Sequence, residues 1–108
     1  MPKTALPADA IPLIAERFKV LSEPARLEIL NVLRSGERTV TALVHETGLG
    51  QANVSKHLQL LHAHGFVTRR KAGVSVYYAL AESVDDLCDI MTRQLSAQAT
   101  SRRRALVR

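Results

Sequence analysis

The sequence predicts a mainly α-helical chain with one β-hairpin, in the order α-α-α-α-β-β-α. Three observations carry this prediction. Apolar residues recur at helical spacing in five stretches, a tight glycine-containing turn joins two of these stretches, and the chain after residue 65 alternates with a period of two. Two short helices joined by such a turn and followed by a hairpin form a winged helix-turn-helix.

The length of 108 residues is that of one domain. We expect the winged helix-turn-helix domain over residues 9–98, between a flexible segment 1–8 and a basic flexible tail 99–108. No apolar run is long enough to span a membrane, the first residues lack the pattern of a secretory signal, and the single cysteine excludes an internal disulfide. These features predict a cytoplasmic protein with no membrane partner.

The first two helices are expected on either side of Ser22. Over residues 9–21, apolar side chains return every three or four positions, which is one stripe of a helix. Ser22 is a suitable N-cap for the second helix, since Pro24 then lies in its first turn. The apolar inner face of this second helix is expected to consist of Leu27, Leu30 and Leu33.

Residues 39–65 are expected to form the helix-turn-helix itself. Thr39 is a suitable cap for a third helix that ends at Gly48, and a fourth helix follows from about Gln51 to His64. The buried stripe of the fourth helix is predicted to be Val54, Leu58 and Leu61.

A hairpin and a last helix complete the chain. One strand is predicted from the alternating residues Val74, Val76, Tyr78 and Leu80. Its partner is expected over residues 66–71, with Ala72-Gly73 as the turn, and Ser83 is expected to cap the last helix. The apolar stripes of the first and last helices exceed what a domain of this size covers internally, so we expect a homodimer that pairs through these two helices.

The charge pattern favours a polyanionic partner. The formal net charge is +5, and residues 47–81 contain four cations and no acidic residue. On the fourth helix, amide side chains suit base edges, lysine suits guanine or phosphate, and serine suits either. A solvated helix face is polar too, but it normally includes Asp or Glu. We therefore predict contacts to double-stranded DNA from Gln51, Asn53, Ser55, Lys56, His57 and Gln59.

Two groups of side chains leave alternatives open. His57 flanks the apolar stripe, where it can bind a phosphate or make a structural bond within the domain. Arg69, Arg70 and Lys71 lie beside the predicted hairpin turn, where long cations reach a phosphate ridge or a minor groove. A basic edge strand also guards against aggregation, and we favour DNA contact over this alternative.

Specific runs of the sequence carry a resemblance to a known family. The segments Leu21-Ser-Glu-Pro-Ala-Arg and Val54-Ser-Lys-His-Leu, together with the run from Gly65 to Tyr78, resemble the ArsR/SmtB family of bacterial winged-helix repressors. The similarity covers roughly residues 10–95 and implies a homodimer that binds an operator. The family usually has a serine at the position of Gly50, where it caps the helix that corresponds to the fourth helix here. Glycine is itself an adequate N-cap.

The resemblance also implies two metal sites, and this sequence lacks the ligands of both. The thiolate site of the family is a Cys-Val-Cys run on the third helix, where this chain has Thr39, Val40 and Thr41. The other site pairs Asp-x-His with downstream histidines on the last helix, whereas no histidine follows Asp86-Leu-Cys88. We therefore expect no metal and no other cofactor.

Three side chains remain as candidate sensors. His62 and His64 are two residues apart on a helix and so point in different directions, which favours surface histidines over a metal site. Cys88 lies on the apolar stripe of the last helix, where oxidation would repack a dimer interface. A free cysteine more often serves as a small buried apolar residue, and we favour that interpretation.

The sequence shows no nucleophile–base pair, phosphate-binding loop or pair of catalytic carboxylates, so we do not expect an enzyme. The leading hypothesis is a sequence-specific, homodimeric DNA-binding repressor. The alternative is a winged-helix protein-interaction module whose DNA binding depends on a partner protein.

Overall fold

The computed structural model describes residues 2–107, with the backbone alone for residues 101–107. The described chain has five helices and one antiparallel hairpin in the predicted order, which confirms the mainly α winged helix-turn-helix. The elements are α1 (Ala10–Leu21), α2 (Pro24–Leu33), α3 (Val40–Thr47), α4 (Gln51–Ala63), β1 (Val67–Ala72), β2 (Ser75–Leu80) and α5 (Glu82–Val107).

The core lies where α2, α3 and α4 meet. Its fully buried side chains are Ile29, Leu30, Leu43, Val54, Leu58 and Leu61. Phe66, Val67 and Tyr78 close the core on the side of the hairpin. The stripe predicted for α4 is therefore confirmed, and the other faces of this helix are left for contacts outside the core.

Helix α2 begins at Pro24, and its N-cap is Glu23 rather than the predicted Ser22. The backbone of Glu23 is extended, with φ −89° and ψ 119°. The residue before a proline avoids the helical region, so Pro24 makes its predecessor the cap. The Ser22 hydroxyl instead donates to the Lys19 carbonyl at 2.7 Å, at the end of α1.

The predicted inner face of α2 is correct for Leu30 and Leu33 but wrong for Leu27. Leu27 is 45% exposed, and Ile29 is fully buried instead. The reason is that α2 is surrounded on more than one side. Helices α3 and α4 cover one side of it, while Leu27 lies on the side toward α5. A single stripe read from sequence does not separate these two sides.

Helix α5 begins at Glu82, two residues before the start that a cap at Ser83 predicts, so Ser83 lies inside the helix rather than capping it. The amide of Ala81 donates to the Phe66 carbonyl at 3.0 Å, and the amide of Val84 donates to the Ala81 carbonyl at 3.0 Å. Ala81 therefore ends the hairpin and also starts the helix, which leaves no room for a separate capping residue.

The hairpin turn lies one residue later than predicted. Ala72 pairs with Ser75, so the loop consists of Gly73 and Val74. Gly73 has φ +61°, which suits the first position of a two-residue hairpin loop and which a side chain would disfavour. Val74 is fully exposed at the tip and does not belong to the apolar face of the strand.

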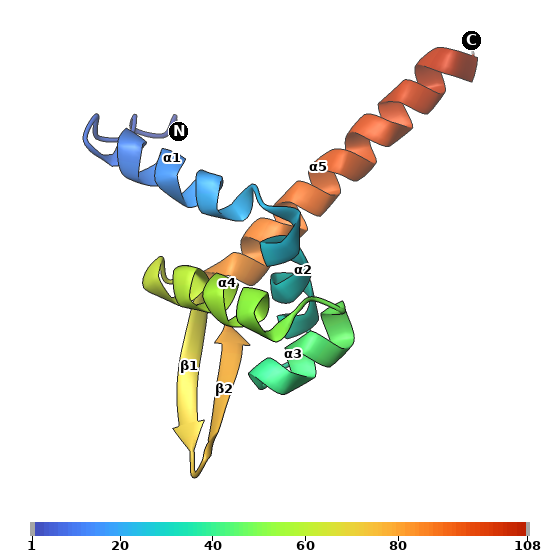
Figure 1. The fold of residues 1–108 in the computed structure, drawn as a ribbon. Coiled ribbons are helices and arrows are strands. Elements are labelled where there is room, and N and C mark those ends of the chain that lie inside the picture. Colours follow the sequence, from blue (N-terminus) through green and yellow to red (C-terminus); the bar gives the residue numbers. More distant parts are fainter. Residues whose placement is uncertain (1, 108) are drawn as a thin grey trace.

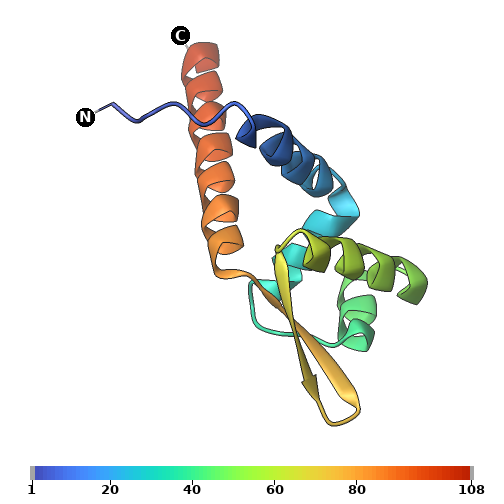
Figure 2. The ribbon, with the colours of Figure 1, turned by 90° about the vertical axis from the view of Figure 1, so that its left-hand side faces the viewer.

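Helices α1 and α5 extend away from the core in different directions (Figures 1 and 2). Helix α5 continues to Val107, so the residues 99–107 that the sequence places in a separate flexible tail belong to this helix. Residues 2–7 of the predicted flexible segment have no helix or strand. Met1 of that segment and Arg108 of the predicted tail lie outside the described residues. None of the described helices has the length and apolar character needed to cross a membrane.

Candidate nucleic-acid interface

Helix α4 presents a polar, acid-free face to solvent. Its exposed side chains include four of the six predicted DNA contacts, namely Gln51, Asn53, Lys56 and Gln59. The N-cap residue Gly50 has no side chain, so no side-chain cap covers the start of the helix. The backbone N–H groups of the first turn are therefore open to an anion.

The other two predicted contacts on α4, Ser55 and His57, are half-buried. Nη1 of Arg26, in α2, lies 3.3 Å from Nδ1 of His57. Nε of the same guanidinium donates to the Val20 carbonyl at 2.6 Å, near the end of α1. Of the two roles open to His57, the structure contains the structural bond within the domain.

The hairpin carries its cations on opposite faces. The strand register pairs Arg69 with Tyr78 and Arg70 with Tyr77. Because side chains alternate along a strand, Arg69 and Lys71 share one face and Arg70 lies on the other. Among the residues whose side chains are described, neither Arg69 nor Lys71 has an ion-pair partner. These two exposed cations are therefore available to an anion outside the domain.

Arg70 already has partners within the protein. Its Nη2 and Nε lie 2.6 and 3.4 Å from the two carboxylate oxygens of Glu37, which lies between α2 and α3. The guanidinium also covers the ring of Tyr77, 4.8 Å from the ring centroid. The hydrogen bond to Glu37, and after it the negative charge of Glu37, raise the pKa of Arg70 above its usual value.

The polar face and the cations belong to two directly connected elements. The amide of Phe66 donates to the Leu61 carbonyl at 2.9 Å, so the hairpin starts at the last turn of α4. From there it extends away from the far end of α5 (Figure 1). The end of the molecule that carries Arg69 and Lys71 is thus opposite to the end of α5.

Two of the candidate metal-ligand positions, Thr39 and His64, have other contacts. Thr39 caps α3 by accepting from the Ala42 amide at 3.2 Å. His62 is exposed, whereas Nε2 of His64 lies 3.4 Å from a carboxylate oxygen of Glu16 in α1. Within the part of the chain whose side chains are described, no three His, Cys, Asp or Glu residues are grouped so as to hold a metal ion.

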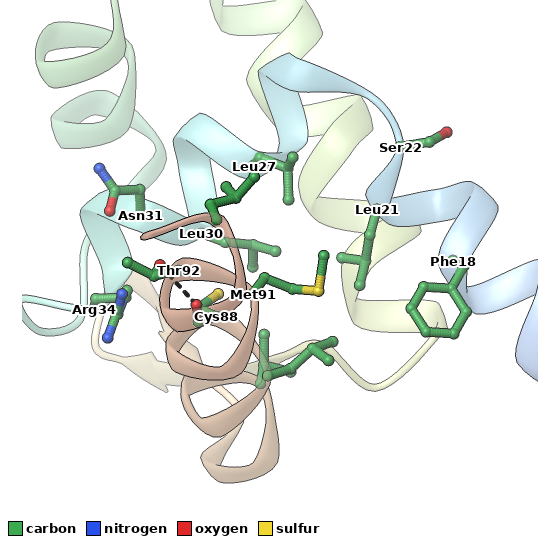
Figure 3. A pocket seen from close by; sticks show the side chains of 13 residues that line it. Phe18, Leu21, Ser22, Leu27, Leu30, Asn31, Arg34, Cys88, Met91 and Thr92 are labelled. Carbon is green, nitrogen blue, oxygen red and sulfur yellow. Dashed lines mark hydrogen bonds between the residues drawn. The ribbon is translucent and has the colours of Figure 1, made fainter. Parts of the chain in front are cut away.

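An apolar groove of about 480 Å³ lies between α1, α2 and α5. Leu30 of α2 and Met91 of α5 face each other across it (Figure 3). Phe18 and Leu95 also line the groove and remain 56% and 64% exposed. The half-buried Cys88 is a further lining residue. The groove thus combines the two apolar stripes, of the first and last helices, that the sequence assigns to a dimer interface.

Sequence reasoning missed three residues that hold the predicted contacts in place: Arg26, Glu37 and Tyr77. Arg26 and Glu37 meet partners that are 31 and 33 residues away in the chain, and no local pattern marks such pairs. A signal existed for Tyr77, because strand alternation places it on the face opposite the buried Tyr78, where a cation of the neighbouring strand can cover its ring.

Comparisons with known proteins agree on a single class of regulator. The family model described as bacterial regulatory protein, arsR family, matches residues 23–69. The transcriptional regulator NmtR of Mycobacterium tuberculosis is 35% identical over 82 residues, which are 76% of this chain and 68% of NmtR. The transcriptional repressor SmtB of the same species is 36% identical over 76 residues, which are 70% of this chain and 56% of SmtB.

A solved structure shows the same architecture. The homodimeric winged helix-turn-helix DNA-binding domain of Mb0332 from Mycobacterium bovis superposes with a TM-score of 0.73 at 28% sequence identity. The match covers 91% of this chain and 91% of that domain.

Proposed function

Because this chain belongs to the arsR family of bacterial regulatory proteins, we propose that it is a sequence-specific repressor that binds its operator as a homodimer and lacks the metal sites of its family. The observation that carries this proposal is the exposed, acid-free face of α4. A carboxylate beside a phosphate weakens binding, so a DNA-facing helix avoids Asp and Glu.

In this proposal, α4 lies in the major groove. Gln51 and Asn53, in its first turn, read base edges, since amides present a donor and an acceptor side by side. Lys56 and Gln59 extend the contact along the helix. The half-buried Ser55 contributes its hydroxyl from the side of the helix nearer to the core. The uncapped N–H groups after Gly50 bind a phosphate.

The hairpin supplies contacts that do not depend on sequence. Arg69 and Lys71 extend from one face of β1 toward the phosphates that flank the site of α4. Phosphate contacts fix the register of a protein on the duplex and carry no sequence information. Arg70 joins them by exchanging Glu37, its partner within the protein, for a phosphate.

The dimer forms through α1 and α5. Large side chains of both helices remain exposed around the groove between them, and a second copy is the surface that would cover them. Two copies related by a twofold axis place their α4 helices about one DNA turn apart, roughly 34 Å. Cys88 then serves as a small apolar side chain in this interface.

The proposal is tested with a labelled duplex of about 30 base pairs taken from the DNA upstream of the gene for this protein, against a shuffled duplex of the same composition. The purified homodimer should bind the upstream duplex at least tenfold more tightly at physiological salt. Weak, equal binding of both duplexes would favour the alternative, a module that needs a partner protein before it binds DNA.

A further inference from the structure

Glu37 lies at the edge of the hairpin although it belongs to no strand. Its neighbour Arg38 exchanges two backbone hydrogen bonds with Tyr78 of β2, at 2.9 and 2.8 Å. Residues on opposite sides of such a bridge share a face, and successive residues alternate between faces. Glu37 therefore lies on the same face as Tyr77 and Arg70, and the Arg70 side chain crosses Tyr77 to reach it.

We propose that Glu37 competes with DNA phosphate for Arg70: it binds the guanidinium in the free protein and releases it when the hairpin contacts the duplex. Glu37 thereby limits how much the hairpin adds to DNA affinity. This inference rests on the proposed DNA-binding function. It adds an affinity-determining residue that lies in neither α4 nor the hairpin.

The exchange is favoured by the exposure of the pair. The side chains of Arg70 and Glu37 are 56% and 41% exposed, and ion pairs in such positions contribute little net stability. A cation that reaches a phosphate also releases a condensed counterion, which is a favourable gain in entropy. For Arg70, contact with a phosphate is thus more favourable than the ion pair with Glu37. Glu37, in contrast, is left as an unpaired negative charge beside the duplex.

A purely structural role for the pair is less consistent with the contacts. The pairing of β1 with β2 holds the two strands of the hairpin together, and the two backbone bonds between Arg38 and Tyr78 fix the hairpin to the domain. Arg38 is itself held by Glu46, at 2.7 Å, and by the carbonyl of Gly36, at 2.8 Å. An exposed pair adds little to these restraints, so its main effect is on charge.

The test compares Glu37→Gln with the wild type on two labelled duplexes, one from the upstream DNA and one of random sequence, over a range of salt concentrations. Glu37→Gln should bind both duplexes more tightly than the wild type does, and by the same factor on each. For each phosphate gained, this factor should be about three- to fourfold larger in 50 mM than in 200 mM salt. The slope of log affinity against log salt should become steeper by about 0.9 per phosphate gained.

A double-mutant cycle separates the exchange from a general effect of charge. Arg70→Ala should reduce affinity more in the Glu37→Gln background than in the wild type, because only there is Arg70 fully available to DNA. Glu46→Gln is the matched control: it breaks a similar Arg–carboxylate pair with the same change of net charge, but the Gly36 carbonyl still holds Arg38. Its salt slope should equal that of the wild type.

Three results would overturn the inference while leaving the proposed function intact. These are lower or unchanged affinity in Glu37→Gln, an equal rise in Glu46→Gln, and an Arg70→Ala effect that is the same in both backgrounds. Glu37→Ala repeats the measurement in case the glutamine finds a new hydrogen bond to Arg70. Failure of the wild type to bind either duplex would instead overturn the proposed function together with the inference.

Discussion

Arg26 of α2 donates a hydrogen bond from Nη1 to Nδ1 of His57 in α4, across 3.3 Å. Arginine has donors and no acceptor, so in this hydrogen bond Nδ1 of His57 is the acceptor. The Nε of Arg26 also donates to the Val20 carbonyl at 2.6 Å. One side chain thus joins the end of the first helix to the middle of the helix proposed to read DNA.

Removing Arg26 should loosen this junction. Arg26→Ala should reduce the free energy of unfolding by about 2 kcal/mol, since hydrogen bonds from a charged group to half-buried acceptors are lost. His57→Ala should reduce it less, because Arg26 keeps its bond to the Val20 carbonyl. Urea unfolding of the two single variants and the double variant measures the coupling. Arg17→Ala, an exposed change on α1, is the control. Strictly additive losses would mean that the Arg26–His57 contact contributes nothing.

The first turn of α4 should determine sequence preference. Gln51→Ala should lose about 1–3 kcal/mol of binding free energy on the operator and should relax the preference at particular base pairs. Affinity for random-sequence DNA should change much less. Binding to a set of operators with single base-pair changes locates the affected positions. His62→Ala, at the exposed far end of the same helix, should bind as the wild type does. If Gln51→Ala also bound every duplex unchanged, the polar face would be only a solvated surface.

The hairpin should behave in the opposite way. Arg69→Ala should weaken binding to all sequences by the same factor and flatten the salt dependence by about 0.9 units of slope for each lost phosphate contact. Lys71→Ala should act similarly, because it shares the face of Arg69. Arg93→Ala removes the same charge from α5 and should leave the slope unchanged. Fluorescence anisotropy at several salt concentrations measures all three. An unchanged slope in both hairpin variants would remove the hairpin from the interface.

Local patterns in the sequence were sufficient to predict most of the fold. The stripe of Val54, Leu58 and Leu61 was predictable because one helix face meets one core, and the turn at Gly48 because only a residue tolerant of φ +75° ends a helix in that way. The exposure of Leu27 was not predictable, since its helix packs on more than one side and periodicity does not show which side a neighbouring helix leaves open.

The candidate site was predictable in its residue types and not in its pairings. The acid-free stretch over residues 47–81 identified α4 and the hairpin. It did not show that Arg70 lies against Glu37, because this pair is created by the bridge between Arg38 and Tyr78, which joins segments 40 residues apart. Two adjacent arginines, equivalent in sequence, therefore differ in the structure.

The groove between α1 and α5 should be covered in the homodimer. Leu95→Asp replaces an apolar side chain that is 64% exposed with a charged one. Because Leu95 is not part of the buried core, the change should disrupt the dimer and not the core of the protomer. Sedimentation should show a monomer at micromolar concentration, with the helical circular dichroism retained and operator binding greatly reduced. Val74→Asp introduces the same charge at the exposed hairpin tip and should remain dimeric. A dimeric Leu95→Asp variant would place the interface elsewhere.

DNA binding should be independent of metals. Thr39 occupies a position where the family has a cysteine ligand and uses its hydroxyl to cap α3, and His64 is directed to the Leu60 carbonyl and to Glu16. A zinc or nickel ion needs about four N, S or O ligands in one place, and neither residue is available without breaking an existing contact. Neither a chelator nor one equivalent of zinc, nickel or cobalt should therefore change the anisotropy of the protein–operator complex. Release of the operator by one equivalent of any of these ions would reveal a site that this chain builds from other residues. Repeating the titration with His62→Ala and His64→Ala would then identify whether either histidine is a ligand, since loss of a ligand raises the metal concentration needed for release.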